Sequence, residues 1–491
     1  MGKTQSHPFQ VSFISSRRRK LLAAGSFLLA LFLVSILSRA RAITASSQQQ
    51  MDRVTYHSPP RVIYDSDPHH IWNRLFLKLY IREGWDGREY GGDELDPYLP
   101  AATKYLIEGP SHKRAMDIFD EFLSTHADRL ITDPLKRAML QRDLWAVFGW
   151  VVSRHSGEKA AGMELEGKLA QMMRRLALTP DQIRALPDTY SAAVNSHSFP
   201  SAYNPAHPEQ SFLPSNLFDP KGPWVCLGFP NGYLGARAHA NFVDGRSTFF
   251  VFLSLPGGRA ATLEYLKRLR DFPMPFLPVA EDFYLVMSDV GIGRNSNPNY
   301  VPNPSLPQFP TGTQVALVRL MMLIDDRGER TPTSLVESIQ FRVFTRISSS
   351  RAEWLSNRAS QSQDVFEFRL DRPRMFGGET GGLRAISKAD GDFPVFLTNG
   401  MDGFVLEPAP NAGAGQEKPQ TRSLLYSILG SCEQCHAAPG IYSMLGPRTI
   451  WSELIEQNSL FQDSTPADQI AITTALARKS EEWAKLHALW K

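Results

Sequence analysis

Hydrophobic residues recur every three or four positions over much of the chain between residues 68 and 200, which is the spacing of amphipathic helices. Helices are predicted for a segment starting near residue 70, for 133–152 with Pro134 at its start, for 164–176, and for a short segment beginning at Thr179. The first helix would be capped by Asp65 or Asp67 and would bury Ile71, Leu75, Phe76 and Leu79. Residues 68–200 are therefore predicted to form a helical region, and the Ser-, Asn- and Pro-rich segment 191–222 a long loop.

The next part of the chain has short apolar runs and alternating patterns that are typical of strands. Strands are predicted at 249–255, 365–370 and 393–397, and a hairpin at 313–324 and 335–347 around Asp325-Asp326-Arg327-Gly328. Alternation in the second hairpin strand assigns one face to Ile339, Phe341, Val343 and Ile347. A helix over 259–270 and an irregular loop over 295–310 interrupt these strands. Residues 201–407 are therefore predicted to be a strand-rich, antiparallel domain.

A Pro-, Gly- and Ala-rich segment over 408–420 indicates a linker before the tail, 421–491. The tail contains helical patterns at 423–429, 450–460 and 467–490. The last is predicted as one long helix with Ile470, Leu476, Trp483, Leu486 and Trp490 on one face. The fold class expected from these patterns is α+β, with a helical region, an antiparallel strand-rich domain and a small helical C-terminal domain.

The N-terminal 42 residues indicate export. Arg17-Arg18-Arg19-Lys20 precedes an uninterrupted apolar run of 17 residues, 21–37, and Ala40-Arg41-Ala42 fits a cleavage site. The run is also just long enough to span a bilayer, so a cleaved signal peptide and a membrane anchor both remain open. Either alternative places the body in the periplasm or on the outer face of a bacterial cytoplasmic membrane, behind a polar tether over 43–67.

The overall charge of +3 comes from this leader, because residues 1–42 contain seven Lys or Arg and no Asp or Glu. The remaining chain has 46 basic and 50 acidic residues, which makes it mildly acidic. Nucleic acid is therefore not expected as a partner.

One short motif carries recognisable chemistry: Cys432-Glu433-Gln434-Cys435-His436, a C-x-x-C-H sequence. This is the attachment signature of haem c. Two thiols three positions apart reach the two vinyl groups of the porphyrin, and the following imidazole becomes the proximal ligand of the iron. One covalently attached haem c is therefore expected, held by Cys432 and Cys435, with His436 on the iron.

Other uses of the same cysteines remain open. A C-x-x-C pair in an exported protein is also compatible with a disulfide or a redox dithiol. A structural zinc site is weakly supported, because Cys226 is the only further thiol and lies in an apolar segment typical of a buried cysteine. The glycines of 377–382 (GGETGG) lack the strand-then-helix setting of a phosphate loop and are predicted to form a flexible turn.

The tail resembles a c-type cytochrome in features beyond the motif. A helical segment precedes it, Gly446-Pro447 follows it, and an amphipathic segment ends the chain. The resemblance implies a cytochrome c-like haem domain over 421–491, in which Pro447 or Pro439 offers a carbonyl oxygen to the proximal histidine. No family is identified for 43–420.

The chain departs from the cytochrome pattern at the distal ligand. Met444 is the only methionine after His436, and it follows unusually closely. It is a distal candidate, but an ordinary core methionine is the competing interpretation. His487 on the last helix and Met401 from the body are further candidates, and an open sixth position is also compatible with the sequence.

Three functions follow as hypotheses. The first is electron transfer through the haem, with a body that binds a substrate or a redox partner protein of the cell envelope. The second is a haem enzyme or a redox or gas sensor with an open sixth position. The third is a non-haem envelope binding protein with a Cys432–Cys435 disulfide. No catalytic residues are assigned, because the sequence contains no recognised nucleophile, zinc-protease or nucleotide-binding motif.

Overall fold

The computed structural model describes residues 62–83, 89–90, 95–96, 105–154, 160–241, 243–278, 300–347, 362–387, 390, 396–398, 404–406, 429, 436, 440–445 and 460–490. All of them belong to one compact unit, Ser58–Lys491. The expected signal or anchor at 1–42, most of the tether, the linker over 408–420 and the cysteines of the motif lie outside the described residues.

The first part of this unit is helical, as the spacing predicts. The helices are α2 (Ile71–Tyr80), α3 (Gly109–Ser124), α4 (Pro134–Arg154), α5 (Ala160–Leu176), α6 (Pro180–Arg184) and α7 (Thr189–Asn195), with a short η1 (Ala127–Arg129). The predicted cap of the first helix was wrong. The ring of His70, rather than Asp65 or Asp67, accepts a hydrogen bond from the Trp72 amide at the start of α2. The helix α7 also occupies the start of the predicted loop 191–222.

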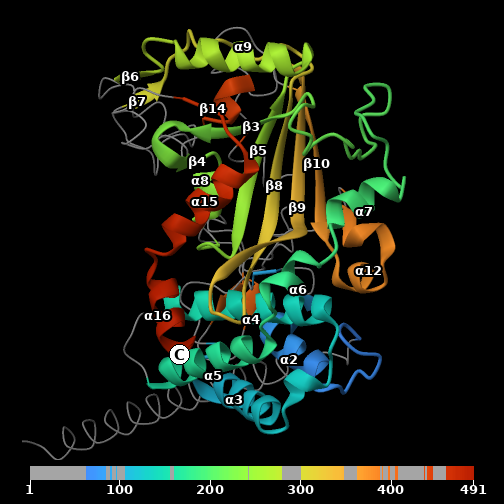
Figure 1. Cartoon of the computed structure of the whole chain (residues 1–491), viewed down its shortest axis with the longest axis vertical. Coiled ribbons are helices and arrows are strands. Elements are labelled where there is room, and N and C mark those ends of the chain that lie inside the picture. Colours follow the sequence, from blue (N-terminus) through green and yellow to red (C-terminus); the bar gives the residue numbers. More distant parts are fainter. Residues whose placement is uncertain are drawn as a thin grey trace, which may run out of the picture. The chain divides into compact units, whose positions relative to one another are not determined.

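Among the described residues, eight strands form one antiparallel sheet (Figure 1). Its order is β11 (Leu383–Ala385), β10 (Ser362–Leu370), β9 (Arg330–Arg346), β8 (Gln314–Ile324), β5 (Ser247–Ser254), β3 (Val225–Phe229) and β14 (Gln462–Asp463), with β4 (Tyr233–Leu234) beside β3. The predicted hairpin is confirmed as β8 and β9, which pair from Gln314↔Val343 to Ile324↔Arg330.

The two faces of the sheet belong to different hydrophobic clusters, because successive side chains of a strand point to opposite sides. In β5, Phe250 and Phe252 belong to the larger cluster, whereas Phe249, Val251 and Leu253 belong to the smaller one. Ile339, Phe341 and Val343 of β9 share the larger cluster, as predicted. Ile347 does not join them, because β9 ends at Arg346 and Ile347 packs against the other cluster.

The remaining described elements are not strands of this sheet. They are η2 (Pro230–Gly232), α8 (Arg237–Ala240), α9 (Gly258–Arg270), α12 (Arg372–Phe376), η4 (Glu379–Gly382), η5 (Gly440–Ser443) and the two-stranded pairs β1–β2 (Arg82–Glu83, Glu89–Tyr90), β6–β7 (Phe276–Pro278, Tyr300–Pro302) and β12–β13 (Phe396–Thr398, Phe404–Leu406). In Figure 1, α2 to α5 gather at one end of the long strands β8 and β9, and α9 lies at the opposite end.

The end of the chain is built into this unit. Strand β14 pairs with β3, and it is followed by α15 (Pro466–Ala477) and α16 (Glu481–Trp490). The single long helix predicted for 467–490 is therefore wrong. Ser480 interrupts it, because its hydroxyl accepts the Trp483 amide and so caps a new helix. Leu476, expected on the buried face, is exposed, whereas Trp483, Leu486 and Trp490 are buried.

These elements establish the coarser fold class, α+β with an antiparallel sheet. None of the helices in the described part of the chain is long and apolar enough to cross a membrane.

Candidate functional site

His436 is the one residue of the C-x-x-C-H motif that falls within the described residues, and it has helical conformation. Its imidazole Nδ1 lies 2.6 Å from the carbonyl oxygen of Ser443. Since a carbonyl oxygen only accepts hydrogen bonds, Nδ1 must carry the hydrogen. The Nε2 atom of His436 therefore has the lone pair that a metal needs.

The acceptor of this hydrogen bond differs from the one expected from the sequence. The cytochrome resemblance implied a carbonyl from Pro447 or Pro439, but Ser443 of η5 occupies that role. Both prolines lie outside the described residues. An acceptor fixed on Nδ1 sets both the tautomer and the direction of the ring.

Hydrogen bonds connect His436 and η5 to the sheet and to the loop before β8. The Gln363 side-chain amide of β10 donates to the His436 carbonyl oxygen over 3.0 Å. The guanidinium of Arg342 on β9 donates to the Ser443 hydroxyl over 3.3 Å. The Ile441 amide donates to the Gln308 side chain over 2.8 Å. The backbone around His436 is thus held by neighbouring strands rather than by the tail alone.

A second histidine, His239 of α8, lies beside His436. The two ring planes are within 4° of parallel, and their centroids are 6.1 Å apart. Phe249 of β5 supports His239, with ring centroids 5.8 Å apart. Since Phe249 belongs to the smaller hydrophobic cluster, the histidine pair lies on that face of the sheet.

The surroundings hold the His436 imidazole neutral. Burial, followed by the nearby positive charge of Arg342, lowers its pKa to about 3 against the opposing hydrogen bond to Ser443. His239 adds a smaller effect in the same direction. The neutral ring is the form that binds metals.

The other sequence candidates for the sixth ligand are placed differently. Met444 is buried in the smaller hydrophobic cluster, together with Ile441 and Leu445 of the same segment. His487 is exposed on α16, and its ring contacts Trp483 of the same helix. Met401 lies outside the described residues.

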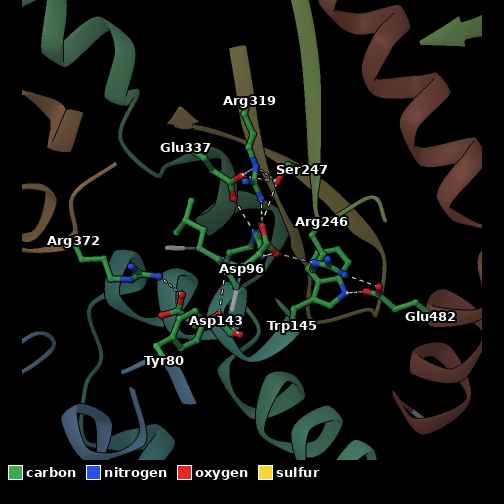
Figure 2. Close-up of polar contacts among 12 residues, drawn as sticks. Tyr80, Asp96, Asp143, Trp145, Arg246, Ser247, Arg319, Glu337, Arg372 and Glu482 are labelled. Atoms are coloured by element: carbon green, nitrogen blue, oxygen red, sulfur yellow. Dashed lines mark hydrogen bonds and ion pairs between the residues drawn. The ribbon is translucent and has the colours of Figure 1, made fainter. Parts of the chain in front are cut away.

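A network of buried charges lies where the helical region meets the sheet (Figure 2). Glu337 Oε1 of β9 accepts a hydrogen bond from Arg142 Nε over 2.9 Å. Its other oxygen, Oε2, accepts from the Ser247 hydroxyl and lies 2.6 Å from Arg319 Nε. Arg319 also pairs with Asp96 and lies over the Phe249 ring at 5.8 Å. Phe249 therefore contacts both Arg319 of the charge network and His239.

The network continues to the C-terminal helix. Arg246 forms two ion pairs, one with Asp96 (Nε to Oδ1, 3.2 Å) and one with Glu482 of α16 (Nη1 to Oε2, 2.6 Å). The Trp145 indole donates to the other oxygen of Glu482 over 2.7 Å. Burial alone would raise the pKa of Asp96, but Arg142, Arg319 and Arg246 override it and hold that pKa well below its usual range. The network thus joins α4, the sheet and α16.

Acidic and basic side chains alternate in this network, so each charge is paired with one of the opposite sign. The network is therefore interpreted as structural, because it links α4, the sheet and α16. A comparable pair, Asp143 and Arg372, lies nearby, with the Tyr64 hydroxyl donating to Asp143 over 2.6 Å. Cys226 is a buried free thiol in β3, as predicted, and burial raises its pKa to about 12.

No group of three or more His, Cys, Asp or Glu suited to a metal ion occurs within the described residues. A haem iron needs fewer protein ligands, because its porphyrin supplies four nitrogens. His436 fits the proximal role by its donor chemistry. Sequence reasoning did not single out His239, and no pattern in its segment, Arg237-Ala238-His239-Ala240, indicates that it lies beside the motif histidine.

No protein-family model, no curated protein and no solved structure matches this chain.

Proposed function

We propose that this protein is an exported electron-transfer protein that carries one covalently attached haem c. Cys432 and Cys435 would form the thioether bonds, and His436 would be the proximal ligand. The haem, when bound, supplies an iron that takes up and releases one electron. The body over 43–407 would bind a redox partner protein or a substrate in the cell envelope.

The hydrogen bond from His436 Nδ1 to the Ser443 carbonyl carries this proposal. It fixes the tautomer that a proximal ligand requires. A C-x-x-C pair that only formed a disulfide would not need the next residue to be a histidine held in this way. The links from Gln363 and Arg342 to the same segment support the proposal, since they fix the ring's backbone on β9 and β10.

The chain's own residues would also set the electronic properties of the site. A hydrogen bond to Nδ1 makes the imidazole a stronger donor to the iron, which favours the oxidised state. The apolar side chains of the smaller cluster exclude water and favour the less charged state. The positive charge of Arg342, close to His436, would also favour the reduced iron, because the oxidised iron carries one more positive charge.

The direct test is expression of the full chain in a bacterium with a cytochrome c maturation system. We expect a haem band that survives denaturing electrophoresis and a pyridine haemochrome spectrum of one haem per chain. Cys432→Ala/Cys435→Ala should abolish both. Cys226→Ala is the matched control and should keep the haem, because Cys226 is buried in β3 within the larger hydrophobic cluster, whereas the histidine pair lies on the face of the smaller one.

A wild-type protein that stays colourless in a host that matures a control cytochrome would overturn the proposal. Two alkylatable thiols, or a mass two hydrogens lower than the reduced chain, would then identify a dithiol or a Cys432–Cys435 disulfide. In that case a non-haem envelope binding protein would be the better interpretation.

A further inference from the structure

We infer that His239 is the second axial ligand, so that the iron is held between His436 of the tail and His239 of the body. This inference rests on the proposed function and deepens it. It would fill the sixth position that the sequence leaves open, and would make the site one for electron transfer rather than for binding a gas or a substrate.

The first argument is the distance between the two rings. Metal–nitrogen bonds to histidine are about 2.0 Å long. An imidazole nitrogen lies about 1.1 Å from its ring centre, given ring bonds near those of an amide C–N. Two imidazoles on opposite sides of one iron therefore have centres about 6 Å apart. The centroids of His239 and His436 are 6.1 Å apart.

The second argument is orientation. The ring planes of His239 and His436 are within 4° of parallel, an arrangement open to two imidazoles that share one axis through the metal. His436 Nδ1 is committed to Ser443, so the iron must bind Nε2. An offset pair of imidazoles in direct contact would have a similar centroid distance. That arrangement is the alternative that the experiment must exclude.

The third argument is that elements other than the segment of His436 hold His239 in place. Its helix α8 lies between β4 and β5, and its ring rests on Phe249. Met444, the nearest sequence candidate, is instead buried among apolar side chains of the smaller cluster. A ligand supplied by the body also explains why the tail contains no methionine at the usual distance after the motif.

The experiment uses the purified, haem-loaded full chain. We expect a low-spin spectrum in both oxidation states, a near-infrared charge-transfer band of two nitrogen ligands, and no rapid change when carbon monoxide is added to the reduced protein. His239→Ala should become high-spin and should take up one carbon monoxide per haem. Added imidazole should restore the low-spin spectrum. His239→Met should stay low-spin but show the charge-transfer band of a methionine ligand and a higher reduction potential.

Two controls separate His239 from the other candidates. His487→Ala removes an exposed histidine of α16, and Met444→Leu keeps the volume of the apolar cluster; both should leave the wild-type spectrum unchanged. Covalent haem with a spectrum that His239→Ala does not alter, or a wild type that binds carbon monoxide at once, would overturn this inference and leave the proposed function intact. Absence of covalent haem from the wild type would remove the proposed function itself.

Discussion

At the scale of single residues, Glu482 is an acid kept in an unusual environment. Its two oxygens accept from Arg246 Nη1 at 2.6 Å and from the Trp145 indole at 2.7 Å, and its side chain is buried. Burial raises its pKa to about 7, in spite of the opposing charge of Arg246. The folded protein therefore retains a proton that the unfolded chain releases near pH 4.5.

This difference predicts a loss of stability as the pH rises. The contribution of Glu482 is complete below about pH 4.5 and disappears progressively up to about pH 7, with a total of about 3 kcal/mol. Glu482→Gln cannot titrate at this position. Between pH 5 and pH 8 the free energy of unfolding of the wild type should therefore fall by about 3 kcal/mol relative to that of Glu482→Gln. Urea unfolding at several pH values measures this. The exposed neighbour Glu481→Gln is the control, and parallel curves for wild type and Glu482→Gln would contradict the prediction.

The same scale shows what could be predicted of the site. Cys432, Cys435 and His436 lie within five consecutive residues, so their spacing alone predicts haem attachment. The Ser443 acceptor and His239 depend on how η5 and α8 come together on one face of the sheet. Their proximity is set by tertiary packing, and no local pattern records it. The network around Glu337 and Asp96 was missed for the same reason.

At the scale of elements, the GGETGG segment runs from the end of α12 into η4 (Glu379–Gly382), which packs against α7. Gly381 has φ of +60°, and a Cβ added there would lie 2.2 Å from the Thr189 carbonyl oxygen and 3.0 Å from the Ala193 amide nitrogen. Backbone atoms of a helix cannot yield as a flexible side chain can. The predicted turn is confirmed only for residues 377–378, because 379–382 form a 3-10 helix, in which close packing requires glycine at 381.

Gly381→Ala should lower the free energy of unfolding by about 3 kcal/mol, from the left-handed conformation and the clash together. Gly378→Ala is a matched control. Its φ is +74°, but nothing lies within 4 Å of the added Cβ, so only the conformational cost of about 1 kcal/mol remains. Urea denaturation of both variants measures the difference. Equal losses would show that α7 does not hold η4 closely.

Element type was predictable wherever one pattern dominated. The β8–β9 hairpin has long apolar strands on either side of a turn with Gly328, and α4 and α5 have clear helical spacing. The break between α15 and α16 was missed although Ser480, followed by two glutamates, is a helix-start signal. Strand β14 has two residues and pairs with β3, and such a short strand shows no pattern of its own.

At the scale of the whole unit, the end of the chain belongs to the body. Strand β14 extends the sheet, and Trp483, Leu486 and Trp490 of α16 share the larger hydrophobic cluster with residues of α4 and α5. Arg174 of α5 donates to the Trp490 carbonyl oxygen over 2.8 Å. This arrangement is compatible with the proposal that a histidine of the body binds the iron of a haem attached to the tail. The predicted boundary at 408–420 lies outside the described residues, but the chain on both sides of it contributes to one sheet.

A tail joined in this way should unfold together with the body. Trp483 is buried, and the Arg330 guanidinium lies 4.1 Å from its ring centroid. Trp483→Ala should therefore lower the stability measured by far-ultraviolet circular dichroism, which reports mainly on the body, by about 3–5 kcal/mol in a single transition. Leu489→Ala, at an exposed position of the same helix, should change it by less than about 0.5 kcal/mol. A tail that folded separately would leave the main transition of Trp483→Ala at the wild-type urea concentration and add a second, weaker one.

The iron is proposed to join the same two parts of the chain through His436 and His239. The haem-free variant Cys432→Ala/Cys435→Ala should therefore unfold in the same single transition, but at a lower urea midpoint than the haem-loaded wild type.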